Sequence, residues 1–227
     1  MTILTSDGLE LEARWDRPHG TLERAVVLCH PHPLDGGTMH APLVRAITTT
    51  LVEDGCAVLR FNFRGVGRSQ GRWGSGIGEV DDVAAAVDAA ARDHPNLPVG
   101  LAGWSFGALT SLRWQAREGS RLPWAGVAPP LQLSTGGRLP DPSTLAPASR
   151  LFVIGNRDQF THHDELAAYA RSADAAFHLF EGSDHFFYFR ERRVGNLVAD
   201  HLAGRSEVEP EQLGGVPGED SPADLGR

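Results

Sequence analysis

The sequence predicts one three-layer α/β/α sandwich with a mostly parallel sheet, and two patterns support this fold class. Short runs of consecutive apolar residues recur along the chain, and such runs are typical of strands that are covered on both faces. Segments with apolar residues at helical spacing lie between the runs. Strands that alternate with helices imply right-handed crossovers and a parallel sheet with helices on both faces.

The elements follow in order from these patterns. Residues 2–5 and 9–15 flank the turn signal Asp7-Gly8 and predict an opening antiparallel hairpin. Further strands are predicted at residues 25–29, 57–63, 99–104, 124–128, 151–155 and 177–180. Helices are predicted at residues 42–52, 79–92, 109–116, 164–173 and 194–202. The helix at 79–92 is the clearest, because its apolar residues share one face and acidic residues occupy its first turn.

Length and composition fit a single domain. The chain has 227 residues, of which 41% are hydrophobic, enough for a sizeable core. We assign residues 1–204 to this domain. Residues 205–227 are rich in acidic residues, glycine and proline, so we predict a disordered acidic tail there.

Charge and residue usage exclude several function classes. The formal net charge of -8 argues against nucleic acid or an anionic membrane as partner. All 21 basic residues are arginine, which excludes a P-loop and a Schiff-base enzyme such as one that uses pyridoxal phosphate. The chain shows no signal peptide and no membrane-spanning stretch, so we expect a soluble cytoplasmic protein. The two cysteines, Cys29 and Cys56, adjoin predicted buried strands and do not imply a disulfide framework.

The most informative motif is Gly103-Trp104-Ser105-Phe106-Gly107, which follows a predicted strand and precedes a predicted helix. This context is typical of a nucleophile elbow, in which a strand turns sharply into a helix and presents a serine at the apex. Ser105 is therefore the predicted nucleophile. A serine hydroxyl needs a histidine to take its proton and a carboxylate to orient that histidine.

Chain order predicts the partners of Ser105. Asp158 lies just past the carboxyl end of a predicted strand, where ligands bind in open α/β sheets, and His185 follows the last predicted strand. Asp164 and Asp184 are the rival acids. Asp184 adjoins His185, and neighbouring side chains on an extended loop tend to point apart, which favours Asp158.

An oxyanion hole needs two backbone amides, one from the residue after the nucleophile and one from the loop after an earlier strand. Phe106 supplies the first amide. In the loop at residues 29–37, Pro31 and Pro33 have no amide hydrogen, which leaves His32 and Leu34 as donors.

Two other motifs carry weaker signals. His30 and His32 could share a metal ion, as in a metal-dependent hydrolase, with a third ligand from His162 or His163. No complete ligand motif is present, so we expect no metal and no cofactor. The glycines at 65–67 lack the last glycine of a dinucleotide fingerprint and predict a tight turn.

Three segments together give the chain a family resemblance. They are HPHPLDGG at 30–37, FNFRGVGRS at 61–69 and GWSFGA at 103–108. With the residues above, they make residues 1–204 resemble the α/β-hydrolase superfamily, and in particular its small lidless bacterial branch related to dienelactone hydrolases and short carboxylesterases. By this resemblance His32 would be the oxyanion donor, although Pro31 departs from the usual His-Gly pattern and keeps Leu34 open.

The resemblance implies a serine hydrolase that cleaves a small carboxylic ester or thioester through an acyl-enzyme on Ser105. Lid domains of this superfamily follow the sixth strand, and residues 129–149 are too few for one. We therefore expect an open, shallow site for a small-molecule ester. The aromatic residues expected to line it are Trp104, Phe106, Phe186 and Phe187. An acyltransferase, a peptidase or a non-catalytic binding protein with this fold are the alternatives, and the oligomeric state is not predicted.

Overall fold

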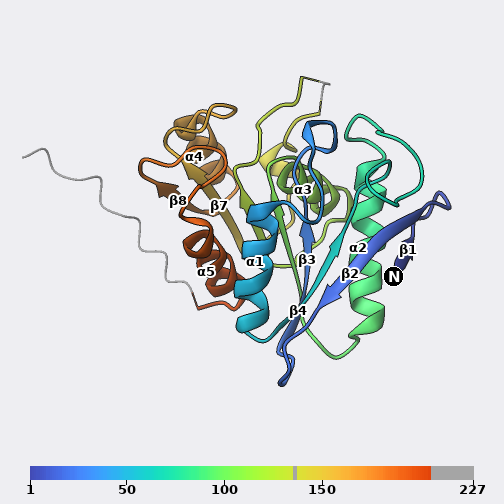
Figure 1. The fold of residues 1–227 in the computed structure, drawn as a ribbon. Helices are drawn as coiled ribbons and strands as arrows, with labels where there is room; N and C mark the ends of the chain where they lie inside the picture. Colours follow the sequence, from blue (N-terminus) through green and yellow to red (C-terminus); the bar gives the residue numbers. More distant parts are fainter. Residues whose placement is uncertain (135–136, 206–227) are drawn as a thin grey trace, which may run out of the picture.

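An eight-stranded sheet forms the middle layer of the fold (Figure 1). The computed structural model describes residues 1–134 and 137–205, and within them the strand order is β1-β2-β4-β3-β5-β6-β7-β8. The strands are β1 (Thr2–Leu4), β2 (Glu10–Asp16), β3 (Arg24–Cys29), β4 (Cys56–Phe61), β5 (Val99–Trp104), β6 (Trp124–Val127), β7 (Arg150–Gly155) and β8 (Ala176–Phe180). β1 and β2 form the predicted antiparallel hairpin, and all pairs from β4 to β8 are parallel. The mostly parallel sheet is thus confirmed.

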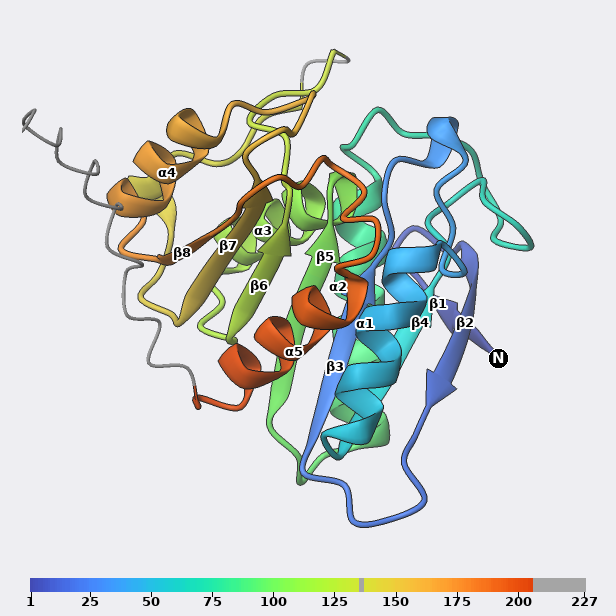
Figure 2. The same cartoon turned by 60° about the vertical axis from the view of Figure 1, so that its left-hand side comes forward.

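Helices cover both faces of this sheet, as Figure 2 shows. The helices are α1 (Pro42–Glu53), α2 (Glu79–Asp93), α3 (Phe106–Glu118), α4 (His163–Ser172) and α5 (Glu191–Leu202). α1 and α5 share one hydrophobic core with the sheet, while α2, α3 and α4 share the other. In β3, Val26 and Leu28 enter the first core, whereas Val27 and Cys29 enter the second. This alternation explains why the strand is apolar throughout.

Several predicted boundaries differ from the structure, and three of them lie at the carboxyl ends of the parallel strands, where the functional edge is. The strand predicted at 57–63 ends at Phe61, and the backbone of Phe63 instead bonds to His30. The helix predicted at 109–116 begins at Phe106, directly after Ser105. The strand predicted at 124–128 ends at Val127, because Ala128 adopts a φ of 47°.

The segment that would carry a lid is a loop. Its described residues contain a β-bridge between Gln132 and Arg138 and a short 3₁₀ turn at Pro142–Thr144, and no α-helix. The lidless prediction is therefore confirmed for this segment. Of the predicted tail, residues 206–227 lie outside the described residues.

Two further observations concern the chain as a whole. Cys29 and Cys56 are buried and unpaired. Among the helices in the described part of the chain, none has the length and apolar character that crossing a bilayer would require.

Candidate active site

Ser105 occupies the sharp turn between β5 and α3. Its φ and ψ are 55° and -119°, in a region that residues other than glycine rarely adopt. The backbone N–H of Ser105 donates to Val127 O at 2.7 Å, which ties the turn to the neighbouring strand β6. Ser105 is partly exposed, while Trp104 and Phe106 on either side are buried. The turn therefore has the strained backbone of an elbow and leaves its serine accessible.

The two glycines of the motif, Gly103 and Gly107, are required because other backbone atoms lie too close to leave room for a side chain. A Cβ on Gly103 would lie 2.5 Å from Ala108 N, and a Cβ on Gly107 would lie 2.4 Å from Cys29 O. No side chain fits at such distances without a shift of the backbone. Gly107 thus lets the start of α3 press against the end of β3, where the loop at 30–37 begins.

Asp158 and His185 meet at the same edge of the sheet. His185 Nδ1 lies 2.7 Å from Asp158 Oδ2, and their side chains are 6% and 0% exposed. The other carboxylate oxygen of Asp158 accepts the backbone N–H groups of Phe160 and Thr161 at 2.8 and 3.0 Å. An Nδ1–H that donates to the carboxylate leaves Nε2 of His185 as the proton acceptor.

Trp104 connects this pair to the elbow. Its Nε1 donates to the backbone oxygen of His185 at 3.2 Å, and the two rings lie 5.9 Å apart. His185 is thereby held next to the residue that precedes Ser105. Within the described residues Ser105 Oγ makes no hydrogen bond, to His185 or to any other group. Such catalytic hydrogen bonds are often long or misaligned before substrate binds.

The rival acids have other partners. Asp184 Oδ1 accepts the backbone N–H groups of Phe186 and Phe187, which supports a turn in which Phe187 has a φ of 54°. Asp164 lies in the first turn of α4 and approaches His162 and His163 at 3.7 and 3.6 Å. The geometry therefore favours Asp158 as the partner of His185.

The loop after β3 offers several amide donors beside the elbow. His32 O accepts the N–H groups of Asp35 and Gly37, which folds the loop into a 3₁₀ turn at Pro33–Asp35. The N–H groups of His32, Leu34 and Phe106 donate to no other described residue. The His32 ring packs on the Phe106 ring at 5.4 Å, whereas Leu34 is 65% exposed. This contact favours His32 over Leu34 as the partner of Phe106 in an oxyanion hole.

His30 is fully buried and anchors the same loop. Its Nδ1 donates to Pro31 O at 2.7 Å, and its Nε2 accepts the N–H of Phe63 at 3.0 Å. Burial lowers the pKa of His30 to about 3, so the ring is neutral at pH 7. Both ring nitrogens are occupied, so His30 is not free to join His32 in binding a metal. The anchoring role was not predicted, because it depends on Phe63, which lies 33 residues away.

Aromatic residues surround the histidine. Phe160 packs against the His185 ring at 4.6 Å, and Phe186 lies 6.1 Å from Trp104 and stacks on Tyr188. The expectation that Phe106 and Phe187 line the site is wrong, because both are completely buried in the hydrophobic cores. Among the described residues, large apolar side chains are exposed mainly in the loops of this edge: Leu34, Ile77, Phe160, Tyr188 and Phe189. Sequence reasoning did not single out Ile77, Phe160, Tyr188 or Phe189.

Comparisons with known proteins agree with this geometry. Residues 20–136 match the model of the family described as serine aminopeptidase, S33. An uncharacterised protein of Rickettsia prowazekii is 30% identical over 202 residues, which are 85% of this chain and 84% of that protein.

Two solved structures share the fold at higher coverage. An α/β serine hydrolase homologue from Coxiella burnetii is 32% identical, with a TM-score of 0.78 over 89% of this chain and 96% of its own. A serine hydrolase without a lid from Xanthomonas campestris is 26% identical, with a TM-score of 0.77 over 92% and 95%. The elbow, the loop order and these matches establish that the chain belongs to the α/β-hydrolase superfamily and has the lidless form of its fold.

Proposed function

We propose that the protein is a serine esterase that cleaves small carboxylic esters or thioesters. The observation that carries the proposal is the buried Asp158–His185 pair, 2.7 Å between Oδ2 and Nδ1, which Trp104 holds beside the strained and accessible Ser105. A carboxylate, an imidazole and a serine in this order are the parts that nucleophilic acyl transfer requires.

In the proposed reaction Ser105 Oγ attacks the ester carbonyl carbon, and Nε2 of His185 takes the hydroxyl proton. Asp158 accepts the Nδ1–H bond and stabilises the imidazolium that forms. The amides of Phe106 and His32 bind the oxyanion of the tetrahedral intermediate. The intermediate expels the alcohol or thiol, which takes the proton from His185. A water molecule then attacks the acyl-enzyme in the same way and releases the acid.

The surroundings of Ser105 favour a small or extended substrate. The described part of the loop at 129–149 contains no helical cover, and apolar side chains around the edge are exposed rather than folded into a tunnel. A hollow of about 430 Å³ opens along β2, and its lining residues include neither Ser105 nor His185. We therefore expect the site beside Ser105 to take small or extended esters better than long acyl chains.

The first test is covalent labelling with a fluorophosphonate probe. We expect one equivalent to react with the wild-type protein and none with Ser105→Ala, while the exposed Ser143→Ala variant labels normally. Retained labelling of Ser105→Ala would contradict Ser105 as the nucleophile. No labelling of the wild type would favour a non-catalytic protein.

The second test compares p-nitrophenyl esters from acetate to palmitate with aminoacyl p-nitroanilides. We expect turnover to be greatest for short acyl esters. Preference for the anilides would favour a peptidase, the activity named in the description of the matching family. Preference for palmitate would contradict the open site.

A further inference from the structure

The glycine-rich segment at residues 71–78, between β4 and α2, packs against the loop that carries His32. The Trp73 ring lies 4.8 Å from the His32 ring and 5.1 Å from the Phe106 ring. Those two residues supply the amides of the proposed oxyanion hole, and their rings also touch one another. Trp73 therefore forms a three-ring cluster with the side chains of the two proposed donor residues.

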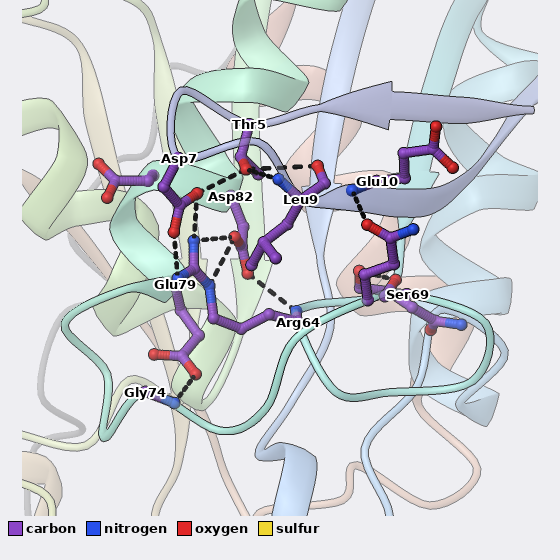
Figure 3. A network of polar contacts seen from close by, with 12 residues as sticks. Thr5, Asp7, Leu9, Glu10, Arg64, Ser69, Gly74, Glu79 and Asp82 are labelled. Atoms are coloured by element: carbon purple, nitrogen blue, oxygen red, sulfur yellow. Dashed lines mark hydrogen bonds and ion pairs between the residues drawn. The ribbon is translucent and has the colours of Figure 1, made fainter.

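Glu79 holds this segment in place from the first residue of α2. Its side chain is completely buried, and its two carboxyl oxygens accept the N–H groups of Gly74 at 2.7 Å and Gly76 at 2.9 Å. Figure 3 shows the contact with Gly74. Glu79 forms no ion pair with any described residue, so these two amides are what compensates its burial.

Asp82, a second buried acidic residue in the first turn of α2, fixes the start of the connection between β4 and α2. Arg64, which follows β4, donates through Nε and Nη2 to Asp82 Oδ1 and through its backbone N–H to Oδ2. Its Nη1 reaches Asp7 in the turn between β1 and β2 at 2.9 Å (Figure 3). The first turn of α2 thus holds the connection from β4 at two places. Asp82 binds Arg64 near its start, and Glu79 binds the amides of Gly74 and Gly76 further along.

The segment has little freedom to move on this support. Arg113 of α3 donates to Gly76 O at 2.7 Å, and a Cβ on Gly78 would lie 2.4 Å from Arg64 Nη1. Between Gly74 and Gly76, Ser75 adopts a φ of 59°. A strained residue between two glycines that both donate to one buried carboxyl group indicates a shaped segment rather than a loose connection.

We propose that Glu79 is a positioning residue for the oxyanion hole. Through Gly74 and Gly76 it keeps Trp73 pressed against His32 and Phe106, and this packing aligns the two backbone amides that receive the oxyanion. The inference rests on the proposed esterase function. It adds a residue that touches neither substrate nor the Ser105, His185 and Asp158 side chains.

The test compares Glu79→Gln with Asp81→Asn, a matched loss of one carboxylate in the same helical turn that contacts Arg117 instead. In Glu79→Gln one oxygen becomes an N–H donor that faces an amide N–H. We expect kcat for a short p-nitrophenyl ester to fall roughly 10- to 100-fold, less than the roughly 10²- to 10³-fold loss on removing an oxyanion-hole donor outright, with KM changed less than about threefold. Asp81→Asn should stay within about twofold of the wild type.

A transition-state mimic separates positioning from a general loss of structure. A trifluoromethyl ketone that adds to the serine places an oxyanion in the hole, so its inhibition constant should rise in parallel with the fall in kcat. Trp73→Ala should reproduce both changes, and Trp73→Phe should restore most of the activity. The double variant Glu79→Gln/Trp73→Ala should be no worse than the more impaired single variant, since both act through one contact.

Defined outcomes would overturn the inference. An unchanged kcat in Glu79→Gln, or a loss confined to KM, would contradict it. If Glu79→Gln does not fold, the Trp73→Ala variant takes its place, and full activity of Trp73→Ala would also contradict the inference. A wild-type protein without esterase activity or fluorophosphonate labelling would instead remove the proposed function, and the inference with it.

Discussion

The two sides of the elbow at Ser105 are built differently. On one side, which we call the oxyanion side (residues 30–37 and 71–78), buried side chains such as His30 and Glu79 bond to the backbone of the loops beside the proposed oxyanion hole. On the other, the histidine side (residues 156–162 and 181–190), backbone amides bond to Asp158, and Asp158 in turn bonds to the ring of His185, the proposed base. Side chains support backbone on the first side, and backbone supports side chains on the second.

This difference predicts how substitutions on the two sides separate activity from stability. The oxyanion side is held by buried hydrogen bonds and close backbone approach, so changes there should affect both properties. The histidine side presents exposed aromatic residues, of which Phe160 is 64% and Phe189 100% exposed. Changes to these exposed side chains should alter the reaction with little effect on the fold.

The largest effect is expected on the histidine side, from Asp158→Asn. An amide in place of the carboxylate no longer holds the productive imidazole tautomer, and kcat should fall on the order of 10⁴-fold, as in serine proteases. The control is Asp184→Asn, which removes the rival acid and weakens only the turn at Phe186 and Phe187. Steady-state kinetics should show less than about a tenfold change for this control. Equal losses in the two variants would contradict the assignment of Asp158.

The next effect is expected at the elbow itself, from Gly107→Ala, where α3 meets His30 of the oxyanion side. The new methyl group would lie 2.4 Å from Cys29 O, so α3 must move away from β3. We expect a loss of about 1 to 3 kcal/mol in the free energy of unfolding. The displaced Phe106 amide should also lower kcat by about 100-fold. Urea unfolding and ester kinetics measure the two effects, and Gly20→Ala, where the Cβ meets no atom within 4 Å, should change neither.

A smaller effect on the oxyanion side depends on pH. The pKa of His30 is about 3 in the folded protein, against 6.5 for an ordinary histidine, so below pH 6.5 the unfolded chain binds a proton that the folded protein excludes. The stabilisation that comes from the neutral His30 is therefore fully present above pH 6.5 and is lost as the pH falls toward 3. The contribution from His30 amounts to about 2 kcal/mol between pH 7 and pH 5.

The variant His30→Gln isolates this contribution. Urea unfolding of the wild type and the variant should give a difference in free energy that is constant above pH 7 and shrinks as the pH falls toward 5. A difference that is independent of pH would show that His30 has the same pKa in the folded and the unfolded chain, and would contradict a buried neutral ring that accepts the Phe63 N–H.

The smallest effect is expected from Phe160→Ala on the histidine side. The ring covers His185 at 4.6 Å but is largely exposed, so its removal should leave the melting temperature within about 1 °C. We expect kcat/KM for short esters to fall about two- to tenfold, because His185 loses a neighbour that limits its motion. A large drop in melting temperature would place Phe160 among the structural residues and weaken the contrast between the two sides.

Much of the fold followed from local sequence patterns. The strands and helices were predicted because a strand buried on both faces and an amphipathic helix each leave a periodicity that neighbouring residues reveal. The elbow was predicted because Gly103 and Gly107 flank a serine between a strand and a helix, and the structure shows the close contacts that require both glycines. Local patterns did not predict which aromatic residues are exposed. Phe186 and Phe187 are adjacent in an irregular loop without periodicity, yet only Phe187 is fully buried.

The sequence by itself determined the layers, the order of the loops at the functional edge and the identity of the elbow serine, since these depend on residues close together in the chain. The sequence favoured Asp158 over Asp184 as the partner of His185, and the tertiary structure shows that pairing. Only the tertiary structure decided that His30 anchors a loop and that Glu79 bonds to the amides of Gly74 and Gly76 beside Trp73. The physical reason is that a buried polar group is assigned by the partners that satisfy it, and for His185 and His30 these lie about 30 residues away along the chain.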